Sequence, residues 1–125
     1  MENMILEWLP MEFSVCKANK ITNEALAAPF TFFARTDEEI SLVCPSAGVP
    51  CGMLIRDDGW ACFRVKGPLD FSLVGILSGI ASCLAAAKVS IFAVSTYDTD
   101  YVLIRRDKKE AAQAALLGAG YEFKR

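Results

Sequence analysis

The fold is decided by residues 60–125, which read WACFRVKGPLDFSLVGILSGIASCLAAAKVSIFAVSTYDTDYVLIRRDKKEAAQAALLGAGYEFKR. Aromatic and β-branched runs in this stretch are typical of strands, and the two alanine-rich runs are typical of helices. The predicted order is a strand at Trp60–Lys66, a helix within Phe71–Ala87, strands at Val89–Thr96 and Tyr101–Arg106, a helix from Asp107 to Gly118 and a strand over 121–124. This order is a complete βαββαβ unit.

Capping residues set the expected ends of the two helices. Asp70 or Ser72 can cap the first helix, because a short polar side chain satisfies free N–H groups there. Asp107 and Glu110 have the spacing of a capping box for the second helix. Gly118 and Gly120 are expected to end that helix.

The first half of the chain reads as a worn copy of the second. Phe13–Val15 matches Phe63–Val65, and the hairpin Phe32–Val43 matches the one in the second half. The expected elements are a short helix at Asn23–Ala28, the loop Cys44–Gly52 in place of the second helix, a last strand at Met53–Arg56 and a joint at Asp57–Gly59. Chance similarity over so few residues is the alternative.

Composition limits the classes of function. The chain has 125 residues, 54% of them apolar, five cysteines, no histidine and a net charge of −2. A mildly acidic chain lacks the basic field that attracts nucleic acid, and without histidine a Ser-His-Asp or Cys-His site within one chain is excluded. Cysteines without a CxxC motif or a secretory signal favour free thiols and a cytoplasmic location. Zinc held by Cys44, Cys51 and Cys62 is a weak alternative, because their spacing matches no known finger.

The uncharged run Phe71–Ala87 approaches the length of a membrane span. Its serines, glycines and alanines dilute the hydrophobicity, so we predict a buried helix and no membrane partner. Small residues recur along one side of it at three- and four-residue spacing: Ser72, Gly75, Gly79, Ser82 and Ala86. A helix that is apolar on nearly all sides is expected to be buried on nearly all sides, and the apolar surplus favours a homodimer.

Topology brings two acidic segments to one end of the predicted sheet. The first strand runs into the loop Gly67–Asp70, and the hairpin of the next two strands turns at Thr96–Asp100. The first helix begins at this end, and its free N–H groups favour an anion, whereas the carboxylates of Asp70, Asp98 and Asp100 favour a cation. An α-amino acid carries both charges, so we predict such a ligand. The competing interpretation is structural: Asp70 is a helix cap, and Asp98 and Asp100 are solvated turn residues.

The motifs that carry these residues are Gly67–Ser72 with Val74–Ile76, and Ile91–Leu103. At these positions the chain resembles the ACT-domain family, in particular small tandem members related to an arginine sensor. The resemblance implies ferredoxin-like units that bind amino acids, commonly between domains, and regulate an attached or partner protein. It also implies that the loop and the turn grip the ligand, with Asp70 and Asp100 contributing to recognition of a basic ligand.

We therefore expect an α+β protein of two tandem ferredoxin-like (βαββαβ) ACT domains, 1–59 and 60–125. The first is degenerate, and the antiparallel sheets carry helices on one face. The expected function is a non-catalytic regulatory module without cofactor or metal, whose regulated partner the sequence does not identify. Its candidate ligand-binding residues are Gly67, Leu69, Asp70, Phe71, Ser72, Ser95, Thr96, Tyr97, Asp98, Thr99 and Asp100. The alternative is an interaction protein that keeps the fold without a ligand.

Overall fold

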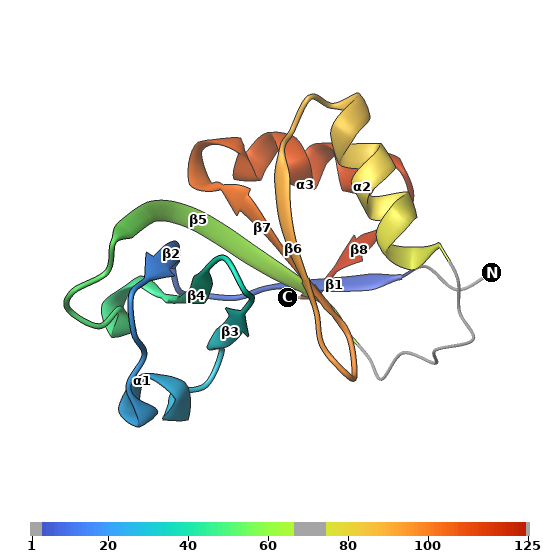
Figure 1. Ribbon diagram of the computed structural model, residues 1–125. Coiled ribbons are helices and arrows are strands. Elements are labelled where there is room, and N and C mark those ends of the chain that lie inside the picture. The colour runs from blue at the N-terminus through green and yellow to red at the C-terminus, as the bar shows by residue number, and fades with distance from the viewer. Residues whose placement is uncertain (1–3, 67–74, 125) are drawn as a thin grey trace. The chain divides into compact units, whose positions relative to one another are not determined.

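The computed structural model describes residues 4–66 and 75–124, and the chain divides into two compact units (Figure 1). The N-terminal unit is Met11–Trp60, and the C-terminal unit combines Met1–Pro10 with Ala61–Arg125. We expected the first ten residues in the first half. They belong instead to the C-terminal unit, because the strand β1 (Ile5–Trp8) pairs with two strands of that unit.

The N-terminal unit, all of whose residues are described, contains four strands and one short helix. Its elements are β2 (Phe13–Ala18), α1 (Asn23–Ala27), β3 (Phe32–Arg35), β4 (Ile40–Pro45), the 3-10 turn η1 (Ser46–Gly48) and the first part of β5 (Ile55–Val65). The strands lie in the order β3–β4–β2–β5, and all three pairs are antiparallel. Helix α1 is capped by the Thr22 hydroxyl, but it buries no residue.

The joint predicted at Asp57–Gly59 lies beside the division between the two units, which falls after Trp60, but it is part of a strand and not a loop. Strand β5 begins at Ile55 and continues through these residues without a break to Val65. The pairing of β2 with β5 is irregular at this place, and Gly59 has a φ of +88°, which side-chain-bearing residues rarely adopt. The glycine therefore permits a β-bulge inside a long strand, where its sequence signal suggested a turn.

Five strands and two α-helices are described in the C-terminal unit. Its elements are β1, the second part of β5, α2 (Ile76–Ala86), β6 (Ile91–Ser95), β7 (Asp100–Arg105), the 3-10 turn η2 (Arg106–Lys108), α3 (Lys109–Gly118) and β8 (Glu122–Phe123). The strands lie in the order β6–β7–β5–β1–β8. Strand β1, which we did not predict, is antiparallel to β5 and parallel to β8.

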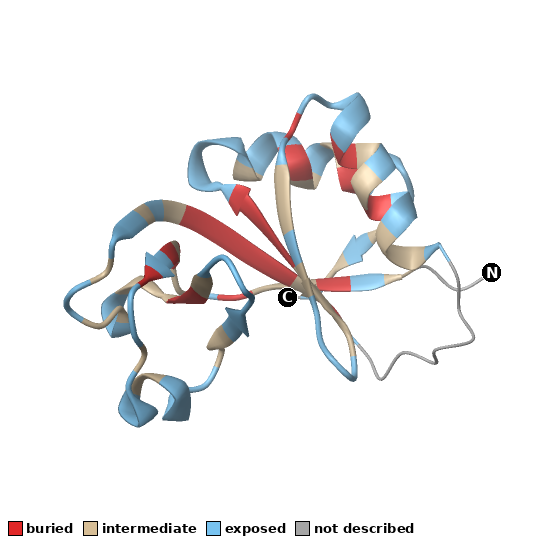
Figure 2. Ribbon diagram, viewed as in Figure 1, coloured by how far each residue is buried: buried red, intermediate tan, exposed pale blue. Residues whose placement is uncertain are grey.

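Both helices of the C-terminal unit pack on one face of its sheet (Figure 2). Alternate residues of the strands point to this face, as a period of two requires. The core consists of Leu6, Phe63, Val65, Val102 and Ile104 from the strands, Ile80 and Leu84 from α2, Val89 from the following loop, and Ala112 and Leu116 from α3. Trp8 fastens β1 to this core, because its ring stacks on Phe123 and its Nε1 donates to Gln113 Oε1 at 2.7 Å.

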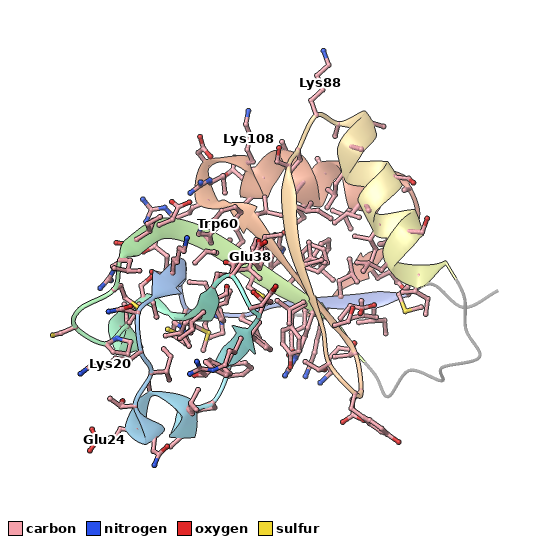
Figure 3. The ribbon with its side chains drawn as sticks, viewed as in Figure 1. Lys20, Glu24, Glu38, Trp60, Lys88 and Lys108 are labelled. Carbon is pink, nitrogen blue, oxygen red and sulfur yellow. The ribbon has the colours of Figure 1, made fainter. Side chains whose placement is uncertain are left out.

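The two helices begin later than we predicted and end alike. Gly75 is the N-cap of α2 and Lys108 that of α3, and neither cap forms a side-chain hydrogen bond. The capping box of Asp107 is therefore wrong, because Asp107 lies in η2; Asp70 and Ser72 fall outside the described residues. At their C-termini both helices close with a left-handed residue, Lys88 and Gly120. Figure 3 shows Lys88 projecting outward just after α2.

Within the single chain, the outer side of α2 is exposed over its described residues, and its expected burial against a neighbouring subunit stays a prediction. Only Ile80 and Leu84 are buried. One residue of the predicted small-residue face is close to another part of the unit, because a Cβ at Gly79 would lie 2.9 Å from the Tyr121 hydroxyl. Its neighbour on the helix, Cys83, donates to the Ala115 carbonyl at 3.3 Å. No helix in the described ranges is long and apolar enough to span a membrane.

Candidate ligand-binding site

The β6–β7 turn carries the described half of the predicted site. Thr96 closes the turn, because its N–H and its hydroxyl both donate to the Thr99 carbonyl, at 2.8 and 2.9 Å. Tyr97 is 80% exposed and Asp98 is also exposed at the tip. The turn therefore presents a phenol and a carboxylate to solvent on a hydrogen-bonded frame.

Ser95 and Asp100 form the first cross-strand pair below the turn. The Ser95 hydroxyl donates to Asp100 Oδ1 at 2.5 Å, and Asp100 is only partly exposed. Because Val102 and Ile104 of the same strand point into the helix-covered core, Asp100 faces the helix side of the sheet. The bond from Ser95 occupies one carboxylate oxygen and orients the group. The other oxygen can accept a hydrogen bond from a further donor, such as an ammonium group.

Thr99 ties the turn to the end of β5. Its hydroxyl donates to the Val65 carbonyl at 2.5 Å, across 34 positions of sequence. Val65 is the last residue of β5, and its side chain is fully buried. The end of the first strand of the unit and the hairpin turn thus lie side by side, as the βαββαβ order predicts.

The other half of the predicted site lies outside the described residues. It consists of Gly67, Leu69, Asp70, Phe71 and Ser72. Helix α2 follows this segment, and its N-cap Gly75 has no side chain that could satisfy the first N–H groups. A helix N-terminus without a side-chain cap leaves donors available to an anion.

Sequence reasoning missed a charged cluster on the sheet face opposite the helices. Glu7 accepts from Arg64 Nε at 2.9 Å and forms ion pairs with Lys124 at 3.3 Å and Lys66 at 3.7 Å. The bond from Arg64 is the main reason why the pKa of Glu7 is below its ordinary value. Arg64 also donates to the Tyr101 hydroxyl at 3.4 Å. The signal available in the sequence was the pair of cations Arg64 and Lys66, which the period of two places on one face of a strand.

The cysteines do not form a reactive centre in the described residues. Burial raises the pKa of the Cys44 thiol to about 11 and that of Cys62 to about 12, so both stay protonated near neutral pH. Cys51, by contrast, is exposed. Across residues 4–66 and 75–124, no three His, Cys, Asp or Glu side chains are grouped so that they could hold a metal ion.

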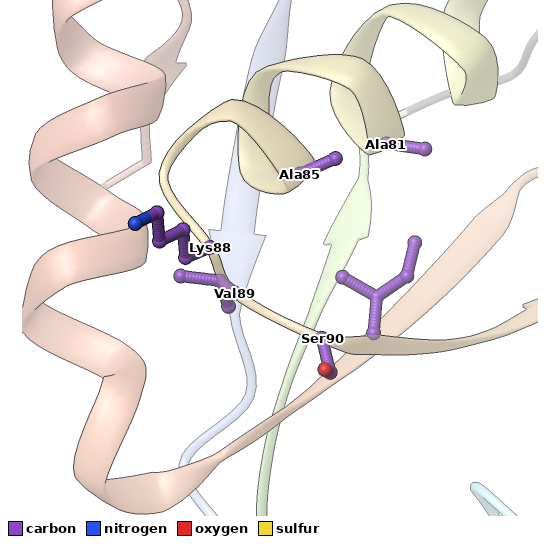
Figure 4. A pocket seen from close by; sticks show the side chains of 6 residues that line it. Ala81, Ala85, Lys88, Val89 and Ser90 are labelled. Carbon is purple, nitrogen blue, oxygen red and sulfur yellow. The ribbon is translucent and has the colours of Figure 1, made fainter.

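A hollow of about 530 Å³ lies at the other end of the C-terminal sheet (Figure 4). It is open, and its lining comes from the end of α2 and the start of β6: Ala81, Ala85, Lys88, Val89, Ser90 and Ile91. Strand β6 leads from this hollow to the predicted turn. The hollow is therefore a surface feature separate from the candidate ligand site.

The ferredoxin-like order of the elements agrees with one known family. The sequence profile of the ACT domain matches residues 55–117, from the start of β5 into α3. The chain belongs to the ACT domain family. It is also 32% identical over 92 residues to the cytosolic arginine sensor for mTORC1 subunit 1 of Rattus norvegicus. The alignment covers 68% of this ACT chain but 28% of the rat protein, so the chain spans under a third of that relative's length.

Solved structures show the same fold. The protein Atu0741 of Agrobacterium tumefaciens matches with a TM-score of 0.87 and 30% identity, over 99% of this chain and 94% of that one. The regulatory subunit of aspartate kinase from Thermus thermophilus, in its ligand-free form, matches with a TM-score of 0.64 and 13% identity. That match covers 94% of this chain and 96% of the subunit. The mixed α+β fold with a mainly antiparallel sheet, which we predicted, is thus shared with both of these solved structures.

Proposed function

We propose that this ACT chain is a non-catalytic regulatory module that binds an amino acid. The ligand lies between the loop after β5 and the β6–β7 turn of the C-terminal unit. The residues that form the site are those predicted from the sequence: Gly67, Leu69, Asp70, Phe71 and Ser72 on the loop, and Ser95 to Asp100 at the turn. The name of the rat relative supports an amino-acid ligand, a sensing role and a cytoplasmic location.

The observation that carries this proposal is the partly exposed carboxylate of Asp100. It is oriented by Ser95 and lies on the helix side of the sheet, at the end of the unit where α2 begins. The first N–H groups of α2 lack a side-chain cap, so they suit an α-carboxylate, and Asp100 suits an ammonium or guanidinium group. The two groups match the two charges of an amino acid.

The test is a thermal-shift panel of the twenty amino acids at millimolar concentration. A ligand that binds only the native state raises its stability by mass action, by about 2.7 kcal/mol at one hundred times its Kd. We expect a stabilising amino acid, with the shift abolished in Asp100→Asn. That variant keeps the shape of the side chain and removes its charge.

A matched control comes from the hairpin of the N-terminal unit. Asp37 lies in the exposed turn between β3 and β4, so Asp37→Asn removes one carboxylate without touching the proposed site. It should retain the full ligand-induced shift. A flat panel with folded protein contradicts amino-acid binding, and equal losses in the two variants contradict the location of the site.

We also propose that the chain is a tandem pair with a degenerate first domain. The strand order supports this. In the N-terminal unit β3 lies beside β4 and β4 beside β2, and in the C-terminal unit β6 lies beside β7 and β7 beside β5. In both units the second strand of the βαββαβ order is therefore followed in the sheet by the third and then the first. Both hairpins turn through four residues that begin with a threonine, Thr36 and Thr96. The first unit has lost most of its helical cover, since α1 buries nothing.

The second candidate function is an interaction protein that binds no ligand. For both candidate functions we propose the same homodimer surface, at strand β6. Strand β6 pairs only with β7 among the described strands, and it has no charge, proline or bulge, the features that normally protect an edge. Beside it lie the hollow and the exposed small side of α2. Two copies of β6 can pair about a twofold axis, so a second copy of this chain is the proposed occupant.

Ala85 is the position from which to test the dimer, because it is exposed and lines the hollow. We expect Ala85→Glu to halve the mass measured by light scattering. The control Ala114→Glu, at an exposed position of α3, should keep the dimer mass. A wild-type protein of monomer mass contradicts the dimer. Gly79→Leu is not suitable, because the new side chain meets Tyr121 within the unit.

A further inference from the structure

The two hairpin turns of this chain share one hydrogen-bonded frame. In the β3–β4 turn, the Thr36 N–H donates to the Glu39 carbonyl at 2.9 Å, and the Thr36 hydroxyl accepts from the Glu39 N–H at 3.1 Å. In the β6–β7 turn, the corresponding bonds of Thr96 and Thr99 are 2.8 and 3.4 Å. The fourth residue of the frame is therefore Glu39 in one turn and Thr99 in the other.

This fourth residue decides whether the turn is fastened to its unit. The Thr99 hydroxyl donates to the carbonyl of Val65, whose side chain is fully buried in the core. An ionised carboxylate only accepts hydrogen bonds, so Glu39 cannot make the equivalent contact, and it is exposed. The next residue also differs, because Asp100 occupies the position that is Ile40 in the other hairpin.

We infer that Thr99 is the positioning residue of the amino-acid site: its hydroxyl fastens the β6–β7 turn to the end of β5 and holds Asp100 in the binding geometry. The β3–β4 turn has neither this hydrogen bond nor a carboxylate at the Asp100 position, so of the two turns the β6–β7 turn carries the site. The inference rests on the proposed function and adds what orders the site before the ligand arrives.

The physical reason is preorganisation. A turn that is free to move must be ordered when the ligand binds, and that cost reduces affinity. The Thr99 bond reaches a carbonyl whose residue is held in a paired strand and a packed core, so the turn takes its position from the rigid part of the unit. The hydroxyl of Thr99 is thereby committed to the protein, and its effect on the ligand is indirect.

The test measures L-arginine binding by titration calorimetry, with arginine as the probe because the rat relative is named an arginine sensor. Thr99→Val keeps the shape of the side chain and removes the donor, whereas Thr99→Ser keeps the donor. One ordinary hydrogen bond corresponds to roughly a fivefold change in affinity. We expect binding about fivefold weaker in Thr99→Val and within about twofold of wild type in Thr99→Ser.

The matched control is Thr36→Val in the other hairpin, which should bind arginine as the wild type does. Wild-type affinity in Thr99→Val overturns the inference, and so does a Thr99→Ser variant as weak as Thr99→Val, because the methyl group would then be the cause. An equal loss in Thr36→Val overturns the assignment of the site to the β6–β7 turn.

A second measurement separates this inference from the proposed function. Amide hydrogen exchange of residues 96–100, without ligand, should be about fivefold faster in Thr99→Val than in the wild type or Thr99→Ser. If the wild type binds no amino acid, the proposed function fails. Faster exchange in that case still supports the ordering role of Thr99, and unchanged exchange overturns it.

Discussion

The two units follow the same path through their third strand and then diverge. Strands β4 and β7 each enter a 3-10 turn through an N-cap with nearly equal backbone angles: φ −55° and ψ 138° at Pro45, φ −53° and ψ 134° at Arg105. Lys109 then takes helical angles and α3 follows, whereas Val49 is extended, with ψ 123°. Pro50 follows Val49, and a residue before proline is driven out of the helical region. The N-terminal unit therefore does not continue from η1 into a helix, because Pro50 follows Val49.

A polar network holds the 3-10 turn η1 that follows β4. Ser14, which is fully buried, donates to Asp58 Oδ1 at 2.5 Å and shares a 2.7 Å bond with the Ser46 hydroxyl of η1. Because the carboxylate can only accept, Ser46 is the donor to Ser14. Arg56 completes the network through Asp58 and the Ser46 carbonyl. The C-terminal unit is held by buried apolar side chains of two helices, and the N-terminal unit is held partly by hydrogen bonds.

The largest expected effect comes from removing a buried apolar side chain of a helix in the C-terminal unit. Leu116 of α3 is fully buried in the core, so Leu116→Ala should reduce the free energy of unfolding by about 2–5 kcal/mol. Its neighbour Leu117 is 49% exposed, and Leu26 of α1 is 43% exposed. The controls Leu117→Ala and Leu26→Ala should stay within about 1 kcal/mol of wild type in urea denaturation. A large loss in Leu26→Ala would contradict the claim that α1 contributes little.

The second prediction concerns the hydrogen-bond network of the N-terminal unit. Ser14→Ala removes the donor to Asp58 and the acceptor for Ser46 in a buried position, which costs about 1–3 kcal/mol by urea denaturation. The control is Ser78→Ala on the exposed side of α2, where a change within about 0.5 kcal/mol is expected. If Ser14→Ala is as mild as Ser78→Ala, hydrogen bonds do not hold η1.

Sequence reasoning found the elements that depend on local chemistry and missed those that depend on distant partners. Aromatic and β-branched runs predict the hairpins, and the short helix predicted at Asn23–Ala28 agrees with α1 (Asn23–Ala27). Strand β1 is four residues long, and its partners begin more than fifty positions away, so its own sequence does not distinguish it from a loop. Gly59 has the signal of a turn, and only the facing strand makes it a bulge.

The candidate site follows the same rule. Asp98 could be placed on the turn and Asp100 at its end, because the geometry of a hairpin depends on neighbouring residues. The orientation of Asp100 by Ser95 follows from cross-strand register, which can be read once the turn is known. The bond from Thr99 to Val65 could not be predicted, because its acceptor is a backbone carbonyl 34 positions away. Every residue has such a carbonyl, so the sequence does not indicate which one accepts the bond.

The third prediction sharpens a comparison inside the C-terminal unit. Both helices end in a Schellman motif: Val89 donates to Leu84 O at 2.9 Å after Lys88, and Tyr121 donates to Leu116 O at 3.0 Å after Gly120. The left-handed residue has a φ of 62° at Lys88 and 99° at Gly120. A side chain in this conformation costs about 1 kcal/mol.

Gly120→Ala should therefore reduce the free energy of unfolding by about 1 kcal/mol, since a Cβ there meets no atom within 4 Å and only backbone strain acts. Lys88→Gly should raise it by about 0.5 kcal/mol, because relief of strain exceeds the lost attraction between a cation and the helix C-terminus. Thermal melts of the two variants and the wild type measure both changes in stability. Equal signs would show that the two helix ends do not share one mechanism.

The smallest expected effect concerns the charged cluster that joins β1 to the sheet. The Arg64 guanidinium lowers the pKa of Glu7 in the folded protein, so the carboxylate stabilises the fold. A lowered pKa gives stability that is fully present above the unfolded value of about 4.3 and is lost as the pH falls through the folded pKa. We expect the urea midpoint of the wild type to fall more steeply below pH 5 than that of Glu7→Gln. Glu122→Gln is the control, because Glu122 is an exposed residue of β8 and should leave the slope of the wild type unchanged. Parallel curves for all three proteins would mean that strand pairing and the packing of Trp8 and Leu6 hold β1 without help from the charged cluster.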